Sequence, residues 1–292
     1  MKRILYCLMG ISLFFVACEK ENSPSPSLED RNWFVIKDNP SNPLDHLIYR
    51  VYENTGIPIF YSDTIGKEER GVDSTGNPYI YYENLNVFYE IRNSNSKGEY
   101  EKSDNIADIT RGVEFVRDYV IPRLKPKFTP LSYFLVNTLT LDAWSTTSNV
   151  YRGMRTTVIA GLSDLKDMSE QELQRLATEA VAAELSVYLY NKYDTELQVF
   201  YSISNDIFGK NIYGMKLSRS TVPSTKTAKE TYGIIEWTKA TLPTQLQDVS
   251  IYLKWVLANN RDSFEKKYGN YSYVVEKYDI LRKLVVTLGF IK

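Results

Sequence analysis

The sequence predicts an α+β fold with a small mixed sheet, a long central helix and a helical C-terminal half. Segments rich in β-branched and aromatic residues lie between 57 and 161, a capped amphipathic helix follows at about 170–192, and helical spacing dominates from Leu242 onward. Strands with helices, followed by helices alone, are typical of an α+β domain. With 292 residues, 43% of them hydrophobic, the chain can bury a sizeable core.

The first 17 residues are predicted to be a lipoprotein signal peptide. Lys2 and Arg3 form a positive region, and the apolar stretch at 4–16 is too short to span a membrane comfortably. The stretch ends FVAC, which resembles a bacterial lipobox, so Cys18 is expected to carry lipid and to anchor the protein in a membrane. The alternative is an ordinary signal peptide with a chance cysteine at this position.

Residues 18–30 are predicted to be a disordered tether, and residues 31–292 a single domain. Acidic residues follow Cys18 directly, as in the surface-export signal of Bacteroidetes lipoproteins, which implies an outer-membrane, lipid-anchored protein at the cell surface. The SPSPS run after them should stay extended. Cys7 lies in the segment removed with the signal peptide, so the mature chain is expected to have no disulfide.

The body of the chain begins with a predicted helix at 44–55, which has Leu44, Ile48 and Val51 on one side and ends at Gly56. The next segments are a strand at 57–63, a turn or hairpin loop at 67–78, one strand or a bent pair at 79–91, and a polar loop at 93–105. Residues 109–124 follow with helical spacing that Pro122 stops, and buried strand candidates lie at 130–142 and within 153–165, the second closed by Gly161.

Ser169 and Glu172 form a predicted capping box at the start of the helix at 170–192. A wide apolar stripe on this helix predicts burial of much of its surface. The next segment, 195–225, mixes short apolar runs with Asn, Gly, Ser and Pro. Amphipathic helices follow from Leu242, interrupted at 259–260 and 269–270.

The centre of the long helix reads Thr178-Glu179-Ala180-Val181-Ala182. In a zinc peptidase such a helix carries His-Glu-x-x-His, with both histidines on the metal and the glutamate polarising the bound water. This chain has one histidine, His46, which is far from the helix in sequence. Because a catalytic zinc usually needs two or three histidines, most histidine-based sites are excluded.

We call Thr178, Glu179 and Ala182 the motif frame. The order of the other segments in the chain also resembles a family of zinc peptidases. The lipobox, IYRVYENTGIPIFYSDT, VEFVRDYVIPRL, a strand, the capped long helix and DVSIYLKWVL follow one another. This order resembles the zinc-binding metallopeptidase lipoproteins of Bacteroidetes, also called substrate import-associated zinc metallohydrolase lipoproteins. The resemblance covers roughly the whole mature chain and implies a zincin-like fold. It places the first motif histidine on Thr178, the glutamate on Glu179 and the second histidine on Ala182.

The resemblance therefore implies a degenerate site with no catalytic residue, no metal and no cofactor. Glu179 is either a relic in the floor of a cleft or a solvent-facing or locally paired helix residue. Carboxylates could bind Ca²⁺, Mg²⁺ or Mn²⁺ instead of zinc, and the acids in or after the helix are Glu179, Glu184, Asp194 and Asp206. Glu179 and Glu184 are separated by roughly 140° around the helix, so they should not converge on one ion.

Other candidate sites have simpler interpretations. Asp73 to Asn77 lacks the ligand pattern of a calcium loop and predicts a β-turn. Trp255 shares a helix face with apolar neighbours and predicts packing, whereas Trp144 is the best candidate for an exposed ring that stacks on a sugar. The chain lacks a GxSxG motif, and its net charge of -1 gives no support for nucleic-acid binding.

Three functions remain open from the sequence. The first is a non-catalytic accessory or binding component of a nutrient import system, for which the resemblance implies a TonB-dependent transporter and a SusD-like lipoprotein as partners. The second is an active zinc-dependent metallohydrolase with non-standard ligands. The third is a structural subunit of the import complex.

Overall fold

The computed structural model describes residues 31–88, 98–141, 146–217, 227–237, 241–258 and 261–291. Its residues divide into two compact units, one up to Trp33 and one from Phe34 to Lys292. The second unit combines small sheets with seven α-helices among the described residues, and its C-terminal half is helical. The predicted α+β class is therefore confirmed.

A four-stranded mixed sheet forms the centre of the strand-containing half. Its order is β1 (Ile59–Phe60), β5 (Tyr133–Leu135), β9 (Thr157–Ile159) and β8 (Val150–Arg152). The first three strands are parallel, whereas β8 runs antiparallel to β9 at the edge. β1, β5 and β9 are buried throughout, which explains their continuous apolar sequence.

Two smaller antiparallel sheets correct parts of the sequence prediction. β2 (Thr64–Val72) pairs with β3 (Pro78–Asn84), and a second sheet contains β4 (Glu99–Glu101), β6 (Thr138–Leu141) and β7 (Thr146–Thr147). The loop predicted at 67–78 was therefore too long, because only 73–77 form the turn. The polar loop at 93–105 contains β4, and the single strand at 130–142 is two strands in different sheets. β2 and β4 lie on exposed surfaces and carry charged side chains, so their sequences do not show the apolar pattern that predicts a strand.

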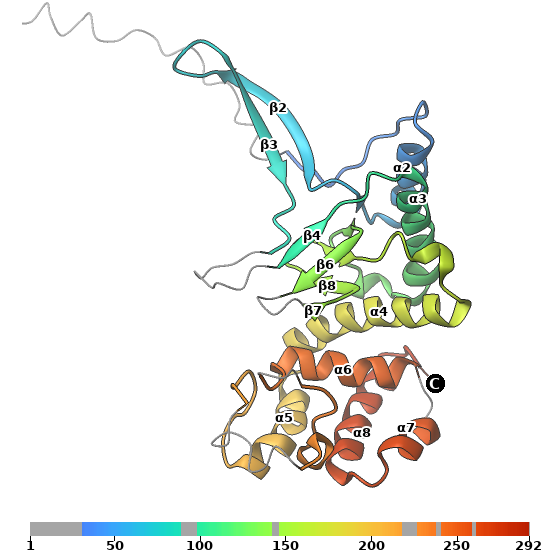
Figure 1. The fold of residues 1–292 in the computed structure, drawn as a ribbon, viewed down its shortest axis with the longest axis vertical. Helices are drawn as coiled ribbons and strands as arrows, with labels where there is room; N and C mark the ends of the chain where they lie inside the picture. The colour runs from blue at the N-terminus through green and yellow to red at the C-terminus, as the bar shows by residue number, and fades with distance from the viewer. Residues whose placement is uncertain are drawn as a thin grey trace, which may run out of the picture. The chain divides into compact units, whose positions relative to one another are not determined.

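Two helices cover the strand-containing half in Figure 1. α2 (Pro43–Thr55) begins at an Asn42 cap and ends at Gly56, whose φ of 71° suits a residue without a Cβ. α3 (Ile106–Phe115) continues through a π-helical turn at Val116–Val120 and a 3₁₀ turn at Ile121–Arg123. Pro122 lies in that last turn, and the regular helix ends seven residues before the proline.

α4 (Glu170–Lys192) has the predicted bounds and the predicted capping box between Ser169 and Glu172. The helices after it are α5 (Asp194–Phe208), α6 (Gln245–Ala258), α7 (Arg261–Tyr268) and α8 (Ser272–Thr287). The composition of 195–225 gave no prediction of α5. Its buried residues Leu197, Phe200, Tyr201 and Ser204 recur at helical spacing. Because the tyrosine and the serine carry polar groups, the sequence does not show a continuous apolar stripe.

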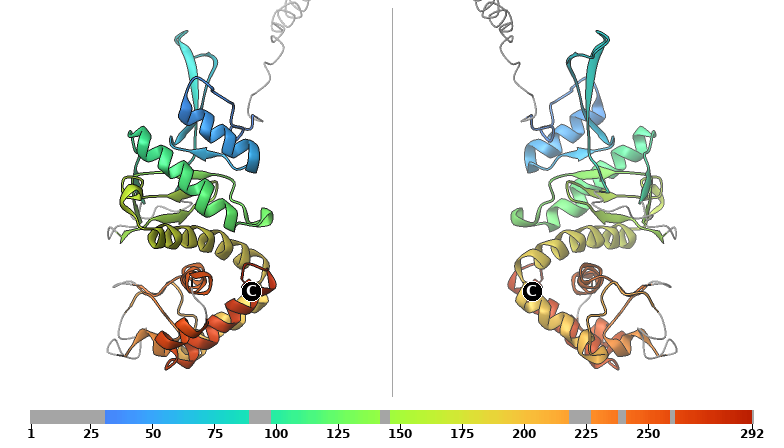
Figure 2. Two further views of the ribbon diagram at one scale, coloured as in Figure 1. Left: turned by 90° about the vertical axis from the view of Figure 1, so that its right-hand side faces the viewer. Right: turned by 90° about the vertical axis from the view of Figure 1, so that its left-hand side faces the viewer.

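α4 lies between two cores, as the views in Figures 1 and 2 agree. Its first half packs into the sheet core, which includes Val113, Val116, Tyr133, Leu135, Ile159, Leu176, Ala177, Ala180 and Val181. Its second half packs into the helical core, which includes Ala182, Leu185, Leu189, Phe200, Val249, Leu253, Phe264, Tyr278 and Leu281. A helix between two cores needs apolar residues over most of its circumference, which explains its wide stripe. Within the described ranges, no helix is long and apolar enough to cross a bilayer.

Candidate functional site

Thr178 and Ala182, the two positions at which the resemblance expects histidines, both make contacts within the protein. The Thr178 hydroxyl donates to the Gln174 carbonyl oxygen at 2.8 Å and accepts a hydrogen bond from Arg123 Nη1 at 3.0 Å. Ala182 is fully buried in the helical core. Thr178 therefore has its oxygen committed to two neighbours, and Ala182 offers no donor atom to a metal.

The carboxylates near the frame do not converge either. Glu179 is partly exposed, and within the described residues its carboxylate forms no hydrogen bond or ion pair. Glu184 faces the mixed sheet instead, where Arg152 Nε lies 2.8 Å from its Oε2 and the Thr157 hydroxyl donates to its Oε1. Burial raises the pKa of Glu184, and both partners act against that rise. Glu184 thus joins α4 to β8 and β9.

Zinc does not fit these residues. A zinc site requires three or four nitrogen, sulfur or carboxylate ligands around one point. Among the residues that the structure describes, no three His, Cys, Asp or Glu side chains lie close enough to hold an ion. His46 lies on α2, where its Nδ1 is 2.7 Å from Asp38.

A groove of about 620 Å³ lies beside Thr178. The first half of α4 forms one wall, and the 3₁₀ turn at Ile121–Arg123 with the two residues after it forms another. The end of α6 and residues 289–291 complete the groove. Thr178 and Val181 both line it. The frame therefore borders a ligand-sized groove on its Thr178 side and a sealed core on its Ala182 side.

The groove carries more positive than negative charge. Arg123, Lys125 and Arg175 line it, together with one carboxylate, Glu170. Both oxygens of Glu170 are occupied, since Oε2 accepts from the Tyr119 hydroxyl and Oε1 from the Gln174 amide, each at 2.7 Å. Burial lowers the pKa of Arg123, and the charge of Glu170 opposes that shift. The guanidinium still carries its charge at neutral pH.

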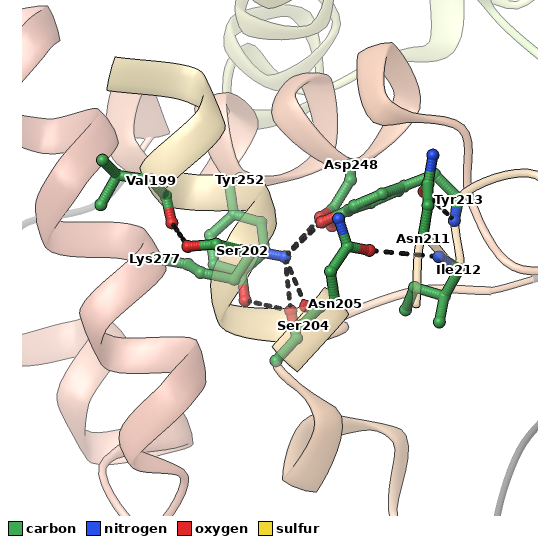
Figure 3. Close-up of polar contacts among 11 residues, drawn as sticks. Val199, Ser202, Ser204, Asn205, Asn211, Ile212, Tyr213, Asp248, Tyr252 and Lys277 are labelled. Atoms are coloured by element: carbon green, nitrogen blue, oxygen red, sulfur yellow. Dashed lines mark hydrogen bonds and ion pairs between the residues drawn. The ribbon is translucent and has the colours of Figure 1, made fainter. Parts of the chain in front are cut away.

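A second polar cluster lies inside the helical core (Figure 3). Lys277 on α8 and Asp248 on α6 are both completely buried, with Nζ 2.5 Å from Asp248 Oδ2. The ammonium group has three further neighbours, which are Ser204 Oγ at 3.0 Å, the Gly233 carbonyl oxygen at 2.9 Å and the Tyr213 hydroxyl at 3.1 Å. Tyr213 also donates to Asp248 Oδ2 at 2.9 Å. This buried lysine cluster ties α5, α6 and α8 to the segments that carry Tyr213 and Gly233.

Aromatic rings enclose the buried lysine cluster. The Lys277 ammonium lies 4.3 Å from the centroid of Phe200 and 5.2 Å from that of Tyr252. Burial lowers the pKa of Lys277 and raises that of Asp248, while their mutual attraction opposes both shifts. Complete burial keeps solutes away from the amine, so its role is to hold the helices together.

The position of Lys277 in the sequence of α8 is a signal for this cluster. Lys277 occupies the apolar stripe formed by Val274, Tyr278, Leu281 and Leu284 on α8. A charged residue on such a stripe requires a buried partner, which Asp248 supplies from α6.

Asp73 and Trp255, two further candidates from the sequence, both have structural roles. Asp73 caps a turn, in which its Oδ1 accepts from the backbone amides of Thr75 and Asn77 at 2.8 and 3.0 Å. Trp255 packs as predicted, with its ring centroid 5.3 Å from that of Tyr268. Cys18 and Trp144 lie outside the described residues.

Comparisons of the chain with protein-family models, with curated proteins and with solved structures find no match.

Proposed function

We propose that the protein is a lipid-anchored, non-catalytic accessory component of an outer-membrane nutrient import system, with a degenerate zincin-like domain that binds its ligand without cleaving it. The observation that carries the proposal is the environment of the motif frame. A threonine hydrogen-bonded to Arg123 and a core alanine stand where the resemblance expects histidines. The mixed sheet followed in the chain by a long helix supports the zincin-like part.

The groove beside Thr178 supports a binding role. Its volume falls in the range of small-molecule sites. Arg123 places a fixed positive charge next to the first motif position, which can attract an anionic group. A guanidinium cannot ionise a bound water as a metal does, so the expected result is binding without hydrolysis.

A structural subunit of the import complex is the second candidate. The hairpin of β2 and β3 exposes Tyr79 and Tyr82, each about half accessible at 51%. Tyrosine is among the residues that contribute most to protein interfaces. An active metallohydrolase with non-standard ligands has no such supporting observation in the described residues.

The test combines anchoring, partners and activity. We expect Cys18→Ala to release the protein from the outer membrane, and the anchored protein to co-purify with a TonB-dependent transporter and a SusD-like lipoprotein. We also expect Glu179→Gln to leave this co-purification unchanged. Chelator-sensitive peptide cleavage that Glu179→Gln abolishes would overturn the non-catalytic proposal.

A further inference from the structure

Arg123 is the most informative residue of the groove. It is half-buried, and its hydrogen bonds to Thr178 Oγ1 and to the Gln174 carbonyl oxygen, at 3.0 and 3.2 Å, both come from Nη1. Both acceptors are uncharged. Nε and Nη2 carry three of the five N–H donors of a guanidinium, and in Arg123 they have no partner among the described residues. Arg123 is therefore positioned by the protein but not neutralised by it.

Two further cations strengthen the positive potential. Arg175 is exposed one turn of α4 before Thr178, so the two residues lie on the same side of the helix. The Lys125 ammonium donates to the Leu288 carbonyl oxygen at 2.7 Å, which fixes its charge at the groove without cancelling it. Among the described residues no ion pair joins Glu170 to Arg123, although the charge of Glu170 acts on the guanidinium and both carboxylate oxygens accept from other groups.

Apolar side chains form part of the lining as well, beside the polar Gln171, Gln174 and Thr178. Leu124, Val181, Leu257, Phe290 and Ile291 contribute side chains, and Phe290 is held against Phe128 with ring centroids 4.8 Å apart. A groove that combines cations with apolar side chains is complementary to an amphipathic anion. The planar fork of Arg123 matches the two oxygens of a carboxylate.

We infer that the groove binds a carboxylate attached to an apolar group, with Arg123 as the anchoring cation. The C-terminus of a short peptide and an aliphatic acid share this chemistry. The inference deepens the proposed binding role and rests on it.

The test measures binding to the full chain in dodecyl maltoside by isothermal titration calorimetry. The probes are N-acetyl-Ala-Leu with a free carboxylate, hexanoate, and the matching amides of both. We expect at least one acid to bind about tenfold or more tightly than its amide, because the charge-assisted hydrogen bonds are lost with the carboxylate. Binding of the peptide acid alone identifies a peptide terminus as the source, and binding of hexanoate identifies an aliphatic acid.

Variants assign the binding to the groove. Arg123→Gln should weaken acid binding by about tenfold or more, and Arg175→Gln by about two- to threefold, with no change in amide binding. Arg50→Gln is the matched control, since Arg50 is an exposed helical arginine that pairs with Glu53 on α2. Circular dichroism checks that each variant is folded.

Three results would overturn the inference: equal affinity for acid and amide, unchanged affinity in folded Arg123→Gln, or no acid binding below about 10 mM. The comparison of acid with amide uses the unaltered protein, so it decides the matter even if Arg123→Gln does not fold. Failure here leaves the non-catalytic proposal standing, whereas zinc-dependent cleavage would contradict that proposal without touching carboxylate binding.

Discussion

Replacing Lys277 with methionine tests the account of the helical core. The substitution keeps a long, flexible side chain and removes the ammonium group. Asp248 would then be a fully buried carboxylate with Tyr213 as its hydrogen-bond donor, while Ser204 and the Gly233 carbonyl oxygen would each lose a donor. Removing one partner of a buried ion pair costs about 3–5 kcal/mol in the free energy of unfolding. Such a loss is a large part of the total stability of a typical domain.

Urea unfolding followed by circular dichroism measures the effect as a shift in midpoint at constant slope. Lys283→Met is the matched control, because Lys283 is exposed on the same helix and its loss should cost less than about 0.5 kcal/mol. The double variant Lys277→Met/Asp248→Leu should be more stable than Lys277→Met, since it leaves no unpaired buried charge. A Lys277→Met protein within about 1 kcal/mol of the unaltered chain would refute the reasoning.

Two further predictions concern α4 and its partner Arg152, and a third concerns Asp63, which lies between β1 and β2. Ala182→His should lower the free energy of unfolding by about 1–3 kcal/mol or more through overpacking of the core, whereas Ala183→His, at a partly exposed position, should cost clearly less in the same urea assay. Arg152→Ala should destabilise by about 3–5 kcal/mol because it strips the buried Glu184 of its cation, and a thermal shift like that of a surface substitution would contradict this. Burial raises the pKa of Asp63, but hydrogen bonds from Lys102 and Tyr100 outweigh that effect, so the pKa is lowered. Its contribution is therefore present above the unfolded pKa of about 4 and lost as pH falls through the lower folded pKa, so the melting-temperature gap between Asp63→Asn and the unaltered chain should close in acid.

Periodicity and caps predicted the elements whose local signals agree with their surroundings. α4 was predicted with both ends because Ser169 and Glu172 form a capping box and the stripe between the ends is unbroken. α2 was predicted because Gly56 ends its apolar spacing.

Elements with mixed signals were missed for physical reasons. β2 carries four charged residues among its nine and has no buried face, so its sequence shows no alternation of apolar and polar residues. α5 buries Tyr201 and Ser204, whose polar atoms interrupt the apolar pattern that would predict a helix.

The resemblance assigns Thr178, Glu179 and Ala182 to the motif frame from the sequence alone, but the side chains that contact these residues could not be predicted. Nothing in the spacing of Thr178, Glu179 and Ala182 shows that Arg123 reaches the first position or that the last position is sealed by the helical core. The Arg123–Thr178 hydrogen bond joins residues 55 positions apart, and the helical core joins α4 to residues still farther along the chain, so periodicity carries no information about either.

The zinc content of the purified full chain tests the central claim most directly, because the claim is that α4 positions no ligand set for this metal. Elemental analysis after dialysis against a zinc-containing buffer gives the ratio of zinc to protein. We predict a ratio well below one that does not change in Glu179→Gln. One zinc per chain in the unaltered protein, lost in Glu179→Gln, would contradict the account.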